Sequence, residues 1–376
     1  MWTDFYDARL ESTWLTTSVW SFHVTPRKRW QAVLAGKTPD RVPCDFWSTG
    51  EVKSRLKREL GCATDRALWE RLDVDKCVHL APLHPLATEE DWHIQSVFPI
   101  WRVGTREVAY QDGLGTYTET IEHPLAKAET AADVERFAWP EPREWDVATF
   151  RARCEIWRDY PIVGMTYEPF YLYCHLRGME QALEDLIVNP QIADAALERI
   201  FEIHAAIIRG ALTAAGDLIT LVYVAEDLGT QESLLMSPAS FRRFLKPRMK
   251  RMIELVHSFG VKVIHHDDGA IRPLLPELIE IGIDVLNPVQ WRCHGMERAG
   301  LARDFGRSLV FHGAVDNQQT LPFGTPDDVR REVADNIRIF RDCKGYVVAP
   351  CHNMQPNTPT ANILALYEAV HEFGRS

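Results

Sequence analysis

The sequence predicts an α/β protein, built as a barrel of eight parallel strands in which strands and helices alternate along the chain. From residue 161 onward, short apolar runs alternate with longer helical stretches, a rhythm typical of a parallel sheet. Two earlier apolar runs, at residues 42–47 and 77–80, bring the number of strands to the eight that close a barrel. The six later runs are residues 161–165, 218–224, 261–266, 284–288, 309–313 and 346–350.

Start signals mark three of the intervening helices. In each, a capping residue and a proline precede the helical stretch: Ser237-Pro238 before 239–258, Thr325-Pro326 before 329–341, and Thr358-Pro359 before 360–373. Residues 101–108 and 116–121, separated by a glycine-containing turn, predict a β-hairpin. We therefore expect an N-terminal extension over residues 1–30 and a single barrel domain over 31–376, with an insertion at about 90–150.

Composition excludes several classes of function. The chain has 42 basic and 53 acidic residues and no dense basic tract, which argues against binding to nucleic acid. It also lacks an apolar run of about eighteen residues and a signal peptide, so we expect no membrane span and a cytoplasmic location. The eight cysteines form no CxxC pair, which argues against a disulfide framework or a closed structural zinc site.

Polar residues follow three of the predicted strands directly. In a parallel barrel the carboxyl ends of the strands meet at one mouth, where active sites form. His266 and Asp268 are two positions apart and can point at one atom, and His352 follows the last strand. These three side chains predict an open metal site, although hydrogen bonding between the histidines across the mouth is an alternative. His265 should face the opposite way and serve a structural role.

Further candidates lie at the same predicted mouth. Of the adjacent acids Glu226 and Asp227, only one can face the barrel axis, as a metal ligand, a substrate-orienting group or a proton carrier; capping of a loop or helix is the alternative. Cys351 could replace or join His352 as a ligand, and we expect one of these neighbours to bind metal and the other to pack. Tyr173 could donate its hydroxyl to a substrate, or pack.

The same segments resemble the uroporphyrinogen decarboxylase superfamily, which also includes cobalamin-linked methyltransferases. The matching segments cover the chain from about residue 25 to its end, and the resemblance implies a distorted (β/α)8 TIM barrel. They are Thr38-Pro39-Asp40-Arg41-Val42-Pro43, Glu226-Asp227-Leu228-Gly229, His266-Asp267-Asp268-Gly269, Ile281-Gly282-Ile283-Asp284, Phe311-His312-Gly313 and Ala349-Pro350-Cys351-His352-Asn353.

The resemblance favours the methyltransferase branch. The decarboxylase branch uses a pair of arginines near the N-terminus and an aspartate after the second strand, and this chain has neither. Without basic partners, a tetracarboxylic substrate would keep several charges unpaired. Methyltransferases of the superfamily bind zinc through a His-x-Cys pair and a later cysteine; here His266 matches the histidine, while Asp268 and His352 stand at the two cysteine positions. This ligand set suits zinc, and also iron or manganese.

We therefore expect a metal-dependent methyltransferase or demethylase that acts on a small methylated or methoxylated compound. No corrinoid-binding DxHxxG segment occurs in the chain, so a corrinoid would come from a partner protein. Trp47, Gln290 and Asn353 are the expected substrate-binding residues, with Asp227, Glu226 and Tyr173 as catalytic candidates. Two alternatives stay open: a metal-dependent decarboxylase or other lyase of a small aromatic or heterocyclic acid, and a non-enzymatic corrinoid-cycle scaffold. A homodimer is also left open.

Overall fold

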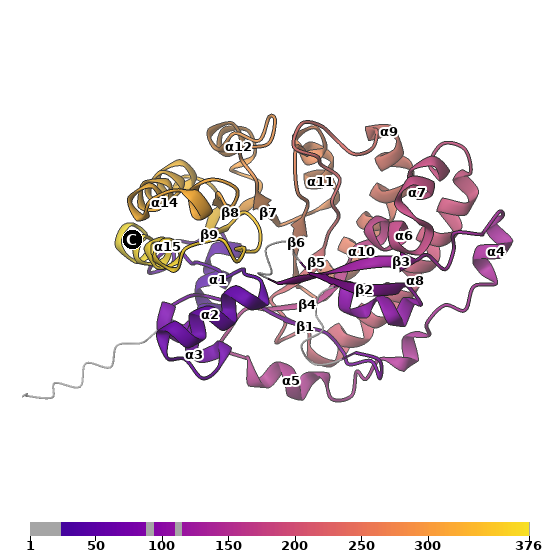
Figure 1. Cartoon of the computed structure of the whole chain (residues 1–376), viewed down its shortest axis with the longest axis horizontal. Helices are drawn as coiled ribbons and strands as arrows, with labels where there is room; N and C mark the ends of the chain where they lie inside the picture. The colour runs from indigo at the N-terminus through magenta and orange to yellow at the C-terminus, as the bar shows by residue number, and fades with distance from the viewer. Residues whose placement is uncertain (1–23, 88–93, 110–114, 376) are drawn as a thin grey trace, which may run out of the picture.

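The computed structural model describes residues 24–87, 94–109 and 115–375. Within them, seven parallel strands form one curved sheet in the order β1-β4-β5-β6-β7-β8-β9 (Figure 1). Within this sheet each strand pairs with the strand of the sheet that follows it in the chain, as in a barrel, so the predicted α/β class and distorted (β/α)8 TIM barrel are confirmed. The strands are β1 (Val78–Leu80), β4 (Ile162–Tyr167), β5 (Leu221–Val224), β6 (Lys262–His266), β7 (Val285–Val289), β8 (Val310–Val315) and β9 (Gly345–Pro350).

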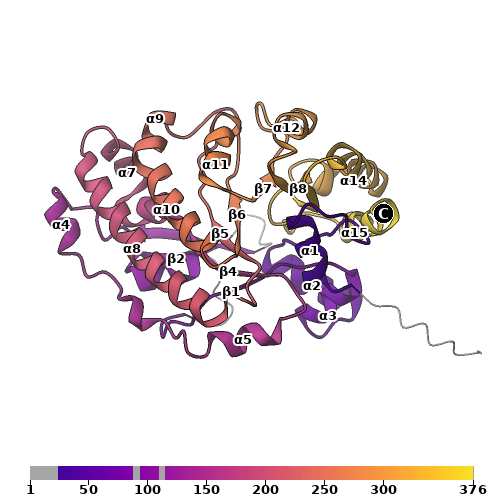
Figure 2. The ribbon, with the colours of Figure 1, turned by 180° about the vertical axis from the view of Figure 1, so that it is seen from behind.

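Helices connect the strands and cover the outside of the sheet. The long helix α8 (Pro190–Ala215) and α10 (Lys246–His257) pack against each other behind β4–β6 (Figure 2). The remaining α-helices are α1 (Pro26–Leu34), α2 (Gly50–Leu60), α3 (Asp65–Leu72), α4 (Ala131–Glu135), α5 (Phe150–Ile156), α6 (Pro169–Arg177), α7 (Met179–Asp185), α9 (Pro238–Ser240), α11 (Leu275–Ile281), α12 (Arg298–Phe305), α13 (Thr320–Phe323), α14 (Pro326–Phe340) and α15 (Thr360–Phe373).

Two of the three expected caps form. Ser237 and Thr325 accept backbone N–H groups at the starts of α9 and α14, whereas α15 begins after Pro359 with no side-chain cap. The expected helix over 239–258 is interrupted, because residues Phe241–Leu245 form a π-helical segment before α10.

The expected first strand at 42–47 is wrong. On one side this segment runs beside β9, where Cys44 and Val348 form an isolated parallel bridge. On the other side the Asp45 carboxylate, not a backbone carbonyl, accepts the N–H of Cys77 at 3.0 Å. Because the side chain takes this donor, no regular ladder forms with β1. The barrel therefore has a seam between β1 and the segment 43–48.

The predicted hairpin insertion is confirmed. Strands β2 (Gly104–Ala109) and β3 (Thr116–Glu122) pair antiparallel and cross in front of the sheet in Figure 1. The turn between them lies outside the described residues. The division into an N-terminal extension and one barrel domain stays a prediction, since the described part begins at residue 24.

The barrel interior is packed with side chains. Its apolar cluster contains Val163, Leu221 and Ile264 from the strands, and Trp30 of α1 and Trp47 from the seam segment join it. Trp30 is fully buried and donates its indole N–H to the carbonyl of Asp75 at 2.9 Å. Full burial of an aliphatic side chain such as Leu221 stabilises the fold by about 1.5–3 kcal/mol.

The N-terminal and C-terminal helices of the described chain lie side by side. The early helices α2 and α3 lie beside α15 in both views (Figures 1 and 2), and Arg55 of α2 donates to the carbonyl of Thr358 at 2.5 Å. His371 of α15 is hydrogen-bonded to the carbonyl of Leu72 at 3.0 Å. Among the helices of the described residues, none has the length and apolar character of a membrane span.

Candidate metal centre

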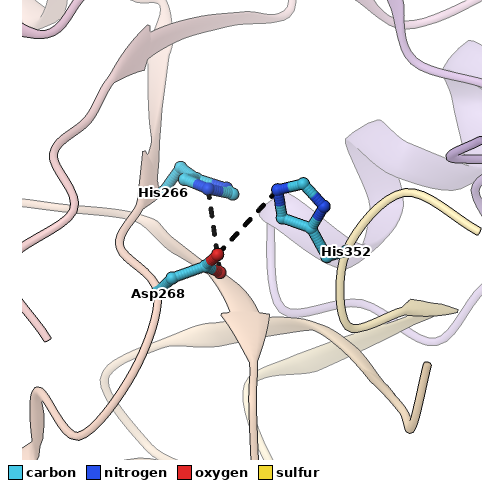
Figure 3. A group of neighbouring side chains, drawn as sticks. All are labelled: His266, Asp268 and His352. Carbon is cyan, nitrogen blue, oxygen red and sulfur yellow. Dashed lines mark ion pairs between the residues drawn. The ribbon is translucent and has the colours of Figure 1, made fainter. Parts of the chain in front are cut away.

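Three predicted ligands converge at the carboxyl ends of β6 and β9. Ligand atoms of His266, Asp268 and His352 all lie within 4.8 Å of one another. The Asp268 carboxylate stands between the two imidazoles: its Oδ1 is 3.8 Å from His266 Nε2, and its Oδ2 is 3.8 Å from His352 Nε2 (Figure 3). His266 is almost buried, whereas the His352 side chain is 39% exposed, so the group opens toward solvent on one side.

Two glycines allow the loops that carry the acids to touch. A Cβ on Gly229 would lie 2.4 Å from the carbonyl oxygen of Asp268, and one on Gly269 would lie 2.4 Å from Gly229. Gly269 also has φ +90°, which other residues rarely adopt. The backbones of the loops after β5 and β6 therefore cross in contact, and this brings Asp227 Oδ1 to 3.7 Å from His266 Nε2.

A chain of buried hydrogen bonds fixes the tautomer of His266. The Asp45 carboxylate is 3.1 Å from His312 Nε2, which must therefore carry the proton. His312 Nδ1 then accepts from the Asn287 amide nitrogen at 2.6 Å, and the Asn287 oxygen accepts from His266 Nδ1 at 2.6 Å. This assignment follows from the hydrogen-bond network. It leaves the lone pair of His266 on Nε2, the atom that faces Asp268.

The interior of the barrel carries this chain from strand to strand. Asp45 lies in the seam segment, His312 on β8, Asn287 on β7 and His266 at the end of β6. Asp45 and His312 are fully buried, and Lys76 lies 3.4 Å from Asp45. The nearby Lys76 and His312 offset the burial penalty and hold the pKa of Asp45 well below its usual value.

Two aromatic side chains pack against the His266 ring. The indole of Trp47 is nearly parallel to it, with ring centroids 6.1 Å apart, and the ring of Tyr223 is stacked at 5.6 Å. Trp47 is itself fixed by its N–H, which donates to Asp45 Oδ2 at 2.7 Å. The imidazole thus has little freedom to turn away from the ligand position.

The surroundings of the cluster are acidic. Burial raises the pKa of Glu168, at the end of β4, to about 7; Asp227 adds to this rise and the charge of His266 opposes it. Burial alone would lower the pKa of His266, but Asp268 and Asp227 outweigh it and raise this pKa. Glu168 was absent from the sequence-based candidates, although it follows a predicted strand.

The donor set fits a divalent metal ion. Ligands bound to one ion at about 2.0–2.2 Å are at most about 4.4 Å apart. The two pairs at 3.8 Å already satisfy this limit. Asp268 Oδ1 is also buried without a hydrogen-bond partner among the described residues, which is costly for a carboxylate oxygen unless a cation or water meets it. Two imidazoles and a carboxylate suit zinc, iron and manganese.

The adjacent acids at 226 and 227 have separate surroundings. The Glu226 carboxylate is buried and accepts the N–H groups of Phe170 and Tyr171 at 2.8 and 3.1 Å, so it caps α6. Asp227 is the acid that reaches His266, as the alternation along a strand requires. Tyr173 does not lie at the cluster: it is buried in α6 and donates to Asp185 at 2.5 Å.

The neighbours Cys351 and His352 diverge. The Cys351 thiol is buried and donates to the carbonyl of Val289 at 3.1 Å, away from the three ligands. Burial raises the pKa of this thiol well above its usual value, which disfavours the thiolate that a metal would need. Of this pair, Cys351 is therefore the residue that packs in the structure. His265 likewise faces away, with Nδ1 2.7 Å from the carbonyl of Val224.

The predicted substrate-binding residues fall in two places. Trp47 and Asn353 line a cavity of about 480 Å³ beside the cluster. Gln290 is buried, and its Oε1 accepts the N–H of Gly269 at 2.7 Å, so it supports the loop that carries Asp268.

Comparison with known proteins was consistent in family and fold. The profile of the family described as uroporphyrinogen decarboxylase (URO-D) matches residues 108–373. A uroporphyrinogen decarboxylase from Pseudomonas syringae pv. tomato is 25% identical over 284 residues, covering 69% of this chain and 74% of the relative. One from Syntrophotalea carbinolica is 25% identical over 258 residues, with coverages of 66% and 71%. The structure of a methyltransferase from Methanosarcina mazei superposes with a TM-score of 0.68 at 22% identity, covering 93% of this chain and 99% of the other, a likeness of fold.

Proposed function

The chain belongs to the uroporphyrinogen decarboxylase family, and from this premise we propose that it is a metal-dependent methyltransferase or demethylase of small methylated or methoxylated compounds. A corrinoid protein is the proposed methyl acceptor, and zinc the proposed metal. The observation that carries the proposal is the convergence of His266, Asp268 and His352 at the barrel mouth, with the His266 lone pair aimed into the group.

The charges around the centre argue against porphyrinogen decarboxylation. Glu168, Asp227 and Asp268 are all acidic, and they would repel the several carboxylates of a porphyrinogen. A methyl ether or methyl thioether brings no charge to this place, and it has an oxygen or sulfur atom that a cation can meet.

Each residue of the candidate metal centre has a role in the proposed reaction. A divalent ion, when bound, polarises the oxygen or sulfur from which the methyl group departs. His266 and His352 hold this ion together with Asp268, while Trp47 and Tyr223 fix the His266 ring. As the methyl carbon passes to the acceptor, the bond to oxygen or sulfur breaks, and that atom takes a proton. We assign this proton to Glu168, a carboxyl group that interacts electrostatically with His266 and whose pKa burial raises to about 7.

A methyl-transfer assay tests this proposal. Zinc-loaded protein is incubated with cob(I)alamin and a panel of methoxylated compounds, and demethylated product and methylcobalamin are both quantified. We expect equal amounts of the two products, and loss of both in Asp268→Ala. Asp335→Ala, which removes an exposed acid of α14, is the control and should keep full activity.

Two outcomes would contradict the proposal. Turnover of a panel acid with release of carbon dioxide and no methyl transfer would instead support the lyase alternative. Equal methyl transfer by the wild type and Asp268→Ala would show that the metal centre takes no part in the reaction.

A further inference from the structure

A cavity occupies the seam of the incomplete barrel. Its volume is about 480 Å³, and its walls include Phe46–Ser48 from the seam segment and Cys77–Leu80 around β1. Aromatic rings form much of the remaining wall; those of Trp69 and Trp157 have centroids 5.5 Å apart. The volume and the flat apolar walls suit a single substituted aromatic ring.

The cavity concentrates positive charge in an acidic protein. The whole chain has a net charge of −11, yet the cavity is lined by Lys53, Lys76 and Arg153 and by one acid, Asp65. Lys76 is paired with the buried Asp45 at 3.4 Å, and Asp65 is shared between Lys53 and Lys57 at 2.6 and 2.7 Å, so these two acids offset only part of the positive charge of the three lysines and Arg153. The lining therefore favours an anionic ligand.

The cavity lies next to the candidate metal centre. Trp47 lines the cavity and lies parallel to the His266 ring, and Asn353, another lining residue, follows His352 directly. Lys53 and Arg153 belong to α2 and α5, whereas the metal side carries Glu168 and Asp227. The carboxylate of a ligand is thus attracted to the Lys53 and Arg153 end of the cavity and repelled by the acids on the metal side. This difference sets the orientation of the ligand.

We propose that this cavity binds an aromatic carboxylic acid, with its carboxylate toward Lys53 and Arg153 and its opposite substituent toward His266. The inference rests on the proposed function and narrows it: the substrate class is methoxylated aromatic acids, and the methoxy group faces the metal ligands. The same orientation keeps the carboxylate away from the metal, which favours methyl transfer over decarboxylation.

Calorimetry on the metal-free protein, without methyl acceptor, tests the inference. Benzoate and 4-methoxybenzoate are compared with two neutral probes, methoxybenzene and 4-methoxybenzyl alcohol. We expect the acids to bind at least about tenfold more tightly than the neutral compounds. Lys53→Met should weaken acid binding at least about tenfold and leave the neutral compounds unchanged, and Lys53→Arg should restore it.

Lys57→Met is the matched control. It lies one turn further along α2 and pairs with the same Asp65, but it does not line the cavity. Acid binding within about twofold of the wild type is expected for it. Thermal melting of the two methionine variants checks that both are folded.

The results separate this inference from the proposed function. Equal binding of acids and neutral compounds, absence of acid binding, or equal effects of Lys53→Met and Lys57→Met would each overturn the inference. Methyl transfer from neutral ethers could still occur in those cases. Conversely, tight acid binding without methyl transfer from any compound of the methoxylated panel would support the cavity assignment and contradict the proposed function.

Discussion

Replacement of Asn287 by leucine should weaken metal binding without a change in any ligand. Asn287 makes two hydrogen bonds of 2.6 Å, one to each of His266 and His312, and all three residues are buried. Asn287→Leu therefore leaves Nδ1 of both histidines without a partner. Each such orphan costs about 1–3 kcal/mol, so the unfolding free energy should fall by about 2–6 kcal/mol, less what the leucine gains by burial.

The same change frees the His266 ring to turn or to move its proton to Nε2. Loss of a partner that orients a ligand typically costs about 10–100-fold in metal affinity. The stabilisation conferred by a fixed excess of zinc should accordingly fall by about 1.4–2.7 kcal/mol relative to the wild type. Zinc affinity is measured by competition with a chelator, and stability by chemical denaturation with and without zinc.

Asn336→Leu is the matched control for this prediction. Asn336 is also fully buried and makes two hydrogen bonds, with Arg298 and with the carbonyl of Ala314, but it lies on α14 away from the ligands. It should lose comparable stability and keep the zinc affinity of the wild type. Unchanged zinc affinity in Asn287→Leu, or an equal loss in Asn336→Leu, would show that Asn287 does not orient His266 for metal binding.

Three further predictions follow from the structure. Cys351→Ala should keep zinc affinity within about threefold, because the thiol donates to the carbonyl of Val289; a loss above about tenfold would make Cys351 a ligand. Tyr173→Phe should lower the unfolding free energy by about 1.5–3 kcal/mol, since it removes a buried hydrogen bond to Asp185. It should leave methyl transfer unchanged. Loss of activity at unchanged stability would contradict this structural role of Tyr173. Burial lowers the pKa of His204 to about 4, so the folded state resists its protonation and stability falls as the pH drops below the unfolded pKa of about 6.5. Between pH 7 and pH 5 this group should account for about 2 kcal/mol of the loss, and denaturation curves of His204→Phe should be less pH-dependent by that amount; parallel pH profiles would refute it.

The metal ligands could be found from sequence because one geometric rule governs them. The carboxyl ends of parallel strands lie at one edge of the sheet. Once the strands are recognised in the sequence, His266, Asp268 and His352 are therefore expected to lie close together. Alternation along the chain also separated Asp227 from Glu226 and His352 from Cys351. Glu168 follows the same rule, since it comes directly after β4. It also precedes Pro169, and a single acid before the start of a helix is equally typical of a helix cap.

Other features depend on contacts between distant segments. The apolar pattern of residues 42–47 is that of a strand, but the Asp45 carboxylate takes the N–H of Cys77 and prevents a ladder with β1. Asn287 and His312 are polar residues within apolar strands, which signals a buried network. Their partners could not be named from the sequence, because the register between neighbouring strands decides which side chains meet.

X-ray absorption at the zinc edge, on wild-type protein loaded with one equivalent of zinc, identifies the atoms that bind the metal. The structure predicts a first shell of nitrogen and oxygen only, with two imidazoles at about 2.0–2.1 Å and a carboxylate oxygen at about 2.0–2.2 Å. Asp268→Ala should lose the zinc or show a changed shell. A sulfur ligand at about 2.3 Å, or a shell without imidazole, would contradict a centre formed by His266, Asp268 and His352.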